Sequence, residues 1–157
     1  MGKVHFPPPV KLIVGMLAGR EEYFHRAEER LEEKFGSVDF RSPLLPFTYT
    51  DYYSWEMGEG LLRKFISFIQ LIDPGDLAGV KRFTNRLEEE LAEGGARRIN
   101  LDPGYISPGK LVLATIKDRG HRIYLGEGIY AEVTLRWRRQ RGFEPWEWTY
   151  PDYRTEE

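Results

Sequence analysis

The chain contains no cysteine among its 157 residues. This absence excludes disulfide frameworks, zinc ribbons, iron–sulfur clusters and cysteine nucleophiles together, and it is typical of a reducing compartment. Apolar runs are also short, because none approaches the ~18 residues that a membrane-spanning helix requires. Residues 1–9 lack the apolar stretch of a secretion signal. We therefore expect a cytoplasmic protein without a membrane partner.

The chain also has no large excess of either charge, since 23 Lys and Arg residues nearly balance 25 Asp and Glu residues. Without a chain-wide positive field, nucleic acid is a disfavoured partner, although a local basic patch remains open. The length fits a single domain, residues 1–157, which can bury a core without a metal or a disulfide. Within it we expect an extended Pro-rich lead-in at residues 1–9 and an aromatic-rich C-terminal tail at residues 143–157.

Motifs of several common enzyme classes are absent from the sequence. There is no Gly-x-x-x-x-Gly-Lys-Ser/Thr phosphate loop, no His-Glu-x-x-His and no Gly-x-Ser-x-Gly. The segment Gly15–Gly19 lies at the end of a predicted strand but lacks the Gly-x-Gly-x-x-Gly spacing of a dinucleotide-binding turn. The sequence thus gives no support to the enzyme classes that these motifs define, and no spacing indicates a particular cofactor.

The periodicity of apolar residues predicts the secondary structure. Runs rich in apolar, β-branched and aromatic residues predict strands at residues 11–17, 47–53, 63–72, 97–101, 121–125 and 129–137. Apolar residues at three- and four-residue spacing predict helices between Gly19 and Gly36, between Asp73 and Gly94, and over residues 109–118. Asp73-Pro74 and Ser107-Pro108 are helix-start signals, because the first residue caps and proline suits the first turn.

The predicted order is β-α-β-β-α-β followed by α-β-β. The first six elements match a ferredoxin-like split β-α-β core, and the last three form a C-terminal extension. We therefore predict an α+β fold with a mostly antiparallel sheet and helices on one face. In the last strand, apolar residues alternate with polar ones and are expected to share one face; they are Ile129, Ala131, Val133, Leu135 and Trp137.

One candidate site lies at Asp102-Pro103-Gly104-Tyr105, between a predicted strand and a predicted helix. Asp102 and Tyr105 would then face a ligand at the strand end, beside helix N–H groups that suit an anion. Asp51, in a segment rich in Thr and Tyr, is a second carboxylate that would share a divalent cation with Asp102. The alternative is an ordinary Asp-Pro-Gly turn in which Asp102 bonds its own backbone.

A second group of candidates lies on the predicted hairpin of residues 121–137. Arg122 and Glu132 are within cross-strand reach and would orient a substrate or phosphate, with Tyr124 beside them. His121 is a candidate general acid or base, together with Glu132 and Asp102, because histidine is the side chain most often used for proton transfer. The alternative is a solvated Arg122–Glu132 pair beside a strand-edge histidine.

Four arginines interleave with Trp137 near the end of the last strand: Arg136, Arg138, Arg139 and Arg141. Basic and aromatic residues together bind single-stranded nucleic acid through phosphate contacts and base stacking. The Lys/Arg-Gly-Phe motif of ferredoxin-like RNA-binding domains is missing, however. The same arginines suit a solvated edge strand that resists aggregation.

Several segments together resemble a known family. They are Phe47–Tyr53, Glu56–Gly58, Phe83–Asn85, Asn100–Tyr105, Lys117–Asp118, His121–Gly126, Gly128–Thr134 and Trp148–Arg154. From about Val10 to its end, the chain is similar to a bacterial family catalogued as domain of unknown function 4416. The resemblance implies no particular activity, cofactor or catalytic residue.

The leading expectation is a protein that binds a small polar or anionic ligand, phosphorylated or nucleotide-like, with enzymatic turnover left open. The residues expected at that site are Asp51, Asp102, Tyr105, His121, Arg122, Tyr124 and Glu132. The alternative is a non-enzymatic interaction or dimerisation module, a homo-oligomer formed through a sheet edge and the tail. Single-stranded nucleic-acid binding is the third expectation.

Overall fold

A nine-stranded antiparallel sheet is the centre of the computed structural model, which describes residues 1–49 and 53–155. Its strands are β1 (Val10–Ala18), β2 (Val38–Arg41), β3 (Leu45–Pro46), β4 (Leu62–Ile72), β5 (Ile99–Ser107), β6 (Lys110–Thr115), β7 (Arg122–Gly126), β8 (Ile129–Arg138) and β9 (Gly142–Pro145). The spatial order is β2-β4-β1-β5-β6-β8-β7, with β3 paired to β4 and β9 paired to β8.

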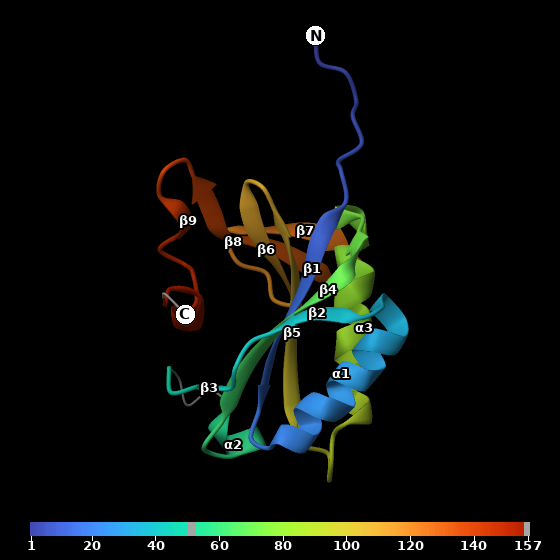
Figure 1. Cartoon of the computed structure of the whole chain (residues 1–157), viewed down its shortest axis with the longest axis vertical. Coiled ribbons are helices and arrows are strands. Elements are labelled where there is room, and N and C mark those ends of the chain that lie inside the picture. Colours follow the sequence, from blue (N-terminus) through green and yellow to red (C-terminus); the bar gives the residue numbers. More distant parts are fainter. Residues whose placement is uncertain (50–52, 156–157) are drawn as a thin grey trace.

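Two long helices, α1 (Glu21–Phe35) and α3 (Leu77–Glu90), pack side by side on one face of this sheet (Figure 1). Alternate residues of β1 pack against their apolar stripes, because successive strand side chains point to opposite faces. A short helix, α2 (Ser54–Met57), precedes β4. The predicted α+β architecture with an antiparallel sheet is confirmed. No helix within the described ranges has the length and apolar character to cross a membrane.

The opposite face of the sheet is covered by the C-terminal tail segment, residues 146–155. The tail is anchored to β8, since Trp148 Nε1 donates to Val133 O at 3.0 Å and Thr149 Oγ1 to Thr134 O at 2.6 Å. Tyr153 packs against the apolar residues that β1 and β6 present on this face. Gly15 makes room for it, because a Cβ there would lie 2.9 Å from the Tyr153 hydroxyl.

Several predicted elements are confirmed at their expected places. The first strand and first helix are present, and the helix ends at Gly36, whose φ of 94° suits glycine. The Asp73 carboxylate accepts a bond from Gly75 N at 2.7 Å, ahead of a 3₁₀ turn (Pro74–Asp76) that leads into α3. The hairpin of β7 and β8 is also present, joined through a turn at Glu127.

The predicted turn at Asp102-Pro103-Gly104 is wrong, because β5 continues through it to Ser107. Pro103 is tolerated since it lies before the β6 pairing begins at Gly104, so its missing N–H removes no β5–β6 bond. Gly104 is required by close packing: a Cβ there would overlap the Val112 carbonyl oxygen and lie 2.7 Å from Leu113 Cδ2. Gly104 therefore allows β5 and β6 to lie close together and does not form a turn.

The helix predicted over residues 109–118, the first element of the C-terminal extension, is wrong. Its apolar run forms strand β6 instead, buried on both faces. Leu111 and Leu113 face the tail, whereas Val112 and Ala114 face the start of α3. A short continuous apolar run fits a buried helix and a doubly buried strand equally well, so periodicity alone could not separate them.

The predicted alternation along β8 holds only as far as Val133. Val112 pairs with Val133 but Leu111 pairs with Leu135, so Thr134 is the extra residue of a β-bulge. Ile129 and Val133 pack toward α3, and Leu135 packs toward the tail. The bulge therefore places Leu135 and the following Trp137 on the opposite face from that of Ile129.

Further segments differ from the predictions: the strand that follows α1 is β2 at Val38–Arg41 and not residues 47–53. Phe47–Tyr49 are not part of a strand, and residues 50–52 of the predicted strand 47–53 lie outside the described residues. Strand β9 was not predicted, because Gly142–Pro145 contains no apolar run. Residues 1–9 project from the start of β1 without regular structure (Figure 1).

Candidate functional site

Strands β5 and β6 separate at one end and leave a cavity between them. They pair only from Gly104 to Ser107 on β5, although β5 begins at Ile99, while β6 stays paired with β8 up to Thr115. Among the described residues, the first half of β5 therefore has only β1 as a strand neighbour. A cavity of about 520 Å³ lies at this gap, and we call it the β5–β6 cavity.

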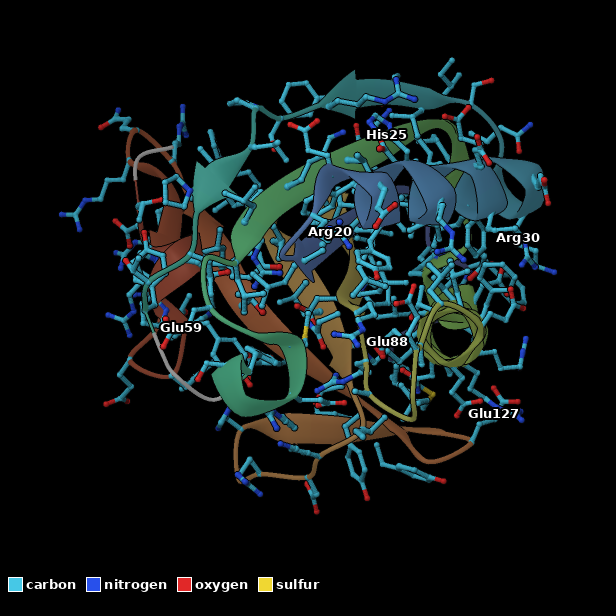
Figure 2. The ribbon with its side chains drawn as sticks, turned by 90° about the horizontal axis from the view of Figure 1, so that it is seen from below. Arg20, His25, Arg30, Glu59, Glu88 and Glu127 are labelled. Carbon is cyan, nitrogen blue, oxygen red and sulfur yellow. The ribbon has the colours of Figure 1, made fainter. Side chains whose placement is uncertain are left out.

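Helix α3 supplies polar side chains to the edge of β5 that has no neighbouring strand among the described residues. Leu101 N donates to Glu88 Oε2 at 3.0 Å, and Lys81 Nζ donates to Leu101 O at 3.1 Å. These two bonds replace those that a neighbouring strand would make, and buried backbone groups require such partners. Lys81 and Glu88 are each only 7% exposed, and Figure 2 shows Glu88 on the inner side of α3. Asn85, between them along the helix, also lines the cavity.

Glu88 is the carboxyl group of the cavity with the most altered acidity. Burial raises its pKa to about 7, against the opposing influence of the nearby Lys81 ammonium. Only its Oε2 atom has a hydrogen-bond partner within the described ranges. Glu88 therefore changes its protonation state near neutral pH and retains a carboxyl oxygen for a further bond.

A chain of charged and amide side chains forms the wall on the β5 side. Arg97 makes paired contacts with Glu56, at 3.0 Å for Nη2–Oε2, and its Nη1 donates to Asn100 Oδ1 at 2.8 Å. Hydrogen bonding from the Arg97 guanidinium lowers the pKa of Glu56. Asn100 Nδ2 then donates to Asp102 Oδ2 at 2.9 Å. The wall is thus held in one arrangement by successive hydrogen bonds.

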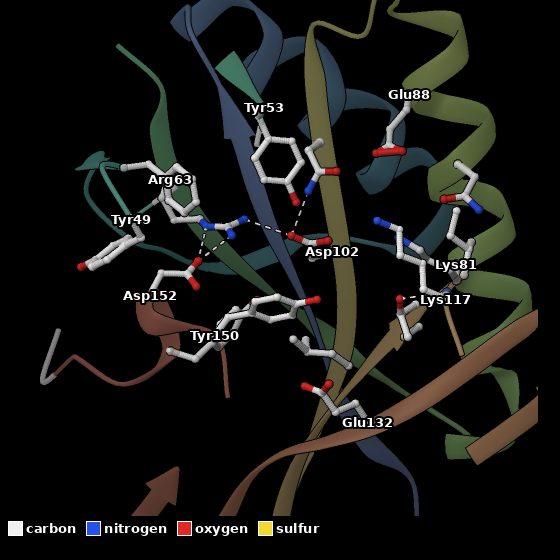
Figure 3. A pocket seen from close by; sticks show the side chains of 18 of the residues that line it. Tyr49, Tyr53, Arg63, Lys81, Glu88, Asp102, Lys117, Glu132, Tyr150 and Asp152 are labelled. Carbon is white, nitrogen blue, oxygen red and sulfur yellow. Dashed lines mark hydrogen bonds and ion pairs between the residues drawn. The ribbon is translucent and has the colours of Figure 1, made fainter. Parts of the chain in front are cut away.

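Arg63 continues this chain across the sheet to the tail. Its Nη1 donates to Asp102 Oδ2 at 3.1 Å, and its Nε donates to Asp152 Oδ2 at 2.8 Å. Arg63 is 5% exposed, so both carboxylates neutralise a buried charge. Figure 3 shows Asp102 between Arg63 on one side and the Lys81 ammonium on the other. The second oxygen of Asp102, Oδ1, has no hydrogen-bond partner in the part of the chain that is described.

Aromatic side chains form the other wall of the cavity: Phe47, Tyr49, Tyr53, Tyr150 and Tyr153. Burial raises the pKa of Tyr53, and the Asp102 carboxylate adds to the effect. Burial likewise raises the pKa of Tyr153, whose hydroxyl has no hydrogen-bond partner within residues 1–49 and 53–155. Both phenols therefore stay neutral at physiological pH. The cavity joins a charged wall to an aromatic one.

Three of the predicted site residues line this cavity: Asp102, Arg122 and Glu132. The expected Arg122–Glu132 pair is present, with Nε and Oε1 3.2 Å apart. Arg122 also donates to Lys117 O at 2.9 Å and to the Tyr150 hydroxyl at 3.1 Å. Because its guanidinium is nearly covered by these partners, Arg122 holds the cavity wall in place rather than presenting an open anion site.

Other predicted residues lie elsewhere. His121 Nε2 is 2.8 Å from Glu132 Oε1, but its ring stacks on Trp148 outside the cavity lining. Tyr105 packs on the α3 side of the sheet, since it lies three positions after Asp102 on the same strand and strand side chains alternate. Tyr124 lies on exposed edge strand β7, where its hydroxyl accepts a bond from Gly128 N.

The proposed cation site of Asp51 and Asp102 stays a prediction. Asp51 lies outside the described residues, so its distance from Asp102 is not defined. Among the residues that are described, no group of three or more His, Asp or Glu side chains is arranged to hold a metal ion.

Sequence reasoning missed the contribution of α3. Lys81, Asn85 and Glu88 recur at spacings of four and three, which places them on one helix face beside the apolar stripe. That polar stripe was a readable signal. Arg63 and Asp152 carried no comparable signal, because they meet only through the path of the tail across the sheet.

Comparison with known proteins gives one finding. A family model described as Domain of unknown function (DUF4416) matches residues 8–157, nearly the whole chain. No curated protein and no solved structure matches the chain. The chain therefore belongs to the DUF4416 family.

Proposed function

We propose that the protein binds a small polar ligand with an anionic group in the β5–β6 cavity, and that Lys81 holds the anion. The observation that carries this proposal is the incomplete pairing of the buried Lys81 ammonium. Among the described residues its hydrogen-bond partner is a backbone carbonyl, and the nearby Glu88 and Asp102 carboxyl groups make no direct ion pair with it. The charge of the buried ammonium is therefore incompletely compensated, and an anionic ligand group would supply a direct ion pair.

The remaining polar groups favour a hydroxylated ligand, such as a phosphorylated or nucleotide-like metabolite. Asp102 and Glu88 each have one carboxyl oxygen, Oδ1 and Oε1 respectively, that is open to a hydroxyl or amine donor. The aromatic wall suits a sugar or a planar ring at the other end of the cavity. Glu88, rather than His121, is placed for proton exchange with such a ligand, because it lines the cavity and its pKa lies near 7.

The test is a titration of ¹⁵N-labelled protein followed by NMR. Adenosine 5′-monophosphate, ribose 5-phosphate and inorganic phosphate are the probes, and adenosine is the uncharged control. We expect the anionic probes to shift the amide signals of Leu101 and Asn85, and Lys81→Met to abolish the shifts. Lys34→Met, at an exposed lysine of α1, should leave them unchanged. An unresponsive parent protein, or an equal response of Lys81→Met, would contradict the proposal.

We also propose that β1, α1, β2, β4, α3 and β5 form a ferredoxin-like split β-α-β core. The spatial order β2-β4-β1-β5, with all neighbours antiparallel, supports this assignment. Strands β6 to β9 then extend the sheet beyond β5. An experimental structure in which β4 did not lie between β2 and β1 would contradict it. The cysteine-free composition supports a cytoplasmic location, which fractionation of cells would test.

Self-association through β7 is a second candidate function. This edge strand exposes three consecutive large side chains, Ile123, Tyr124 and Leu125. Two copies would pair their β7 strands antiparallel about a two-fold axis and cover these residues. Sedimentation velocity over a hundredfold concentration range tests it: we expect a dimer that Ile123→Lys disrupts. A monomer at every concentration would remove this candidate.

A further inference from the structure

Strands β8 and β9 form a hairpin that presents two aromatic rings to solvent. Trp137 pairs with Phe143 across the hairpin, with ring centroids 5.2 Å apart and an interplanar angle of 73°. Trp137 is 51% exposed and Phe143 is 40% exposed. Core rings such as Phe24 and Phe68 are almost fully covered, because aromatic surface in water is unfavourable. The exposed pair therefore needs an explanation beyond packing.

The same hairpin carries an excess of positive charge. Glu144 is the carboxylate that faces its arginines: Arg138 Nε and Arg141 Nη1 each lie 3.6 Å from it, and Arg136 Nε lies 3.9 Å from it. Arg139 has no ion pair with a described residue. Three arginines thus share one carboxylate and a fourth makes no ion pair with a described residue, although the whole chain is nearly neutral.

The tip of the hairpin has a defined shape. Arg141 N donates to Arg138 O at 2.9 Å, and Gln140 and Gly142 adopt positive φ values of 71° and 78°. This tight turn holds Arg139 and Arg141 within a few residues of the Trp137–Phe143 pair. Flat rings and guanidinium groups are thereby presented on one short element.

We propose that the β8–β9 hairpin binds single-stranded nucleic acid, with a base stacked on the Trp137–Phe143 pair and phosphates contacted by Arg138, Arg139 and Arg141. Charge complementarity selects a polyanion, and the exposed rings select one that offers unpaired bases. A role in preventing edge aggregation accounts for the arginines but not for the rings, because exposed rings promote association. A duplex keeps its bases stacked on one another and so leaves the rings without a partner.

Fluorescence anisotropy with labelled twelve-nucleotide strands tests this proposal. The probes are oligouridylate, oligothymidylate and a duplex of the same length, each in 25 to 200 mM KCl. We expect the single strands to bind and to quench tryptophan fluorescence, with affinity that falls as salt rises. Comparison of the RNA and DNA strands identifies the preferred backbone. Trp137→Ala should weaken binding about tenfold, through the loss of one stacking platform.

Charge variants separate a specific contact from general electrostatics. The double variant Arg138→Ser/Arg139→Ser should lower the slope of log affinity against log salt by about 1 to 2. Arg20→Ser/Arg86→Ser removes the same charge at two exposed positions, one just before α1 and one on α3, and should leave the slope unchanged. Circular dichroism confirms that each variant is folded.

Three outcomes would overturn the proposal. One is the absence of single-strand binding at 25 mM KCl, and another is duplex binding as tight as single-strand binding. The third is an equal decrease of the salt-dependence slope in the two double variants. Binding only to anionic lipid vesicles, tested in parallel, would instead assign the rings to a membrane surface and would also overturn it. Lys81→Met should leave the binding of single-stranded nucleic acid intact. The failure of this proposal can therefore be distinguished from the failure of the cavity proposal.

Discussion

The β5–β6 cavity and the β8–β9 hairpin are both rich in charge, but they differ in how that charge is compensated. In the cavity, buried Arg63 has two carboxylate partners, while buried Lys81 donates to a backbone carbonyl and makes no direct ion pair with a described residue. On the hairpin, three arginines share the Glu144 carboxylate, and exposed Arg139 makes no ion pair with a described residue. Unpaired charge is costly only where water is excluded. An unpaired cation is therefore informative in the cavity, whereas on the hairpin the exposed rings are the informative feature.

The largest effect is expected from Arg63→Met in the cavity wall. Removing the guanidinium leaves Asp102 and Asp152 without their shared counterion, so the free energy of unfolding should fall by about 3–5 kcal/mol. Urea denaturation at pH 7 measures the loss. Arg82→Met breaks the exposed Arg82–Glu127 pair and should cost less than about 1 kcal/mol. Equal losses at the two positions would remove the contrast between buried and exposed pairs.

Glu88→Gln should change the pH dependence of stability. The pKa of Glu88 is about 7 in the folded state and 4.5 in the reference state, so the folded protein binds the extra proton between these values. As pH rises from about 4.5 to about 7, the free energy of unfolding of the parent protein should therefore fall by about 3 kcal/mol relative to that of Glu88→Gln. Urea denaturation at pH 4.5, 6 and 8 provides the comparison.

The control for this titration is Glu89→Gln, at the exposed neighbouring position of α3. Gln at position 88 keeps an oxygen that can accept the Leu101 N–H bond, so Glu88→Gln does not remove that bond. The difference between Glu88→Gln and Glu89→Gln is therefore that the first removes a buried carboxyl group and the second an exposed one. A constant difference between the parent and Glu88→Gln over the whole pH range would contradict a buried, titrating carboxyl group.

Gly104→Ala tests the contact at which the cavity begins. A methyl group there would meet the Val112 carbonyl oxygen and the Leu113 side chain, so β5 and β6 must move apart at a cost of about 1–3 kcal/mol. Gly120→Ala, where the new methyl group meets no atom within 4 Å, should leave the melting temperature nearly unchanged. Scanning calorimetry compares the two. A stable Gly104→Ala protein would show that the strands are not in close contact there.

The smallest effects on stability are expected on the hairpin. Arg139→Ser should change the free energy of unfolding by less than about 0.5 kcal/mol, because an exposed arginine without an ion pair contributes little. Trp137→Ala should cost about 1 kcal/mol, mainly the edge contact with Phe143. Urea denaturation measures both. Losses as large as that of Arg63→Met would mean that the hairpin supports the core rather than presenting a binding surface.

Elements with strong local signals were predictable from the sequence. The apolar stripe of α1 has a helical period, and Gly36 and Asp73 mark helix ends by their own chemistry. Strand β1 is buried on both faces, and its apolar run after three prolines was still assigned correctly. The apolar run of residues 109–118 is also buried on both faces, but the Ser107-Pro108 helix-start signal ahead of it favoured a helix. Pro103 and Gly104 were misleading for a related reason: they mark a strand edge and a close contact as often as a turn.

The candidate site was only partly predictable. Cross-strand register placed Arg122 beside Glu132, because hairpin pairing follows from a short turn. Asp102 was singled out for the wrong local reason but lies at the centre of the wall. The partnership of Arg63 with Asp152 depends on how residues 146–155 cross the sheet, and no local pattern encodes that path.

The dual position of the tail has a kinetic consequence. Pro151 and Tyr153 border the cavity, while Asp152 between them is bonded to Arg63 on β4. A ligand that enters by displacing these residues would have to break that buried pair, and one that leaves by the same route would break it again. Exchange by that route would then be slowed by residues 151–153, separately from affinity.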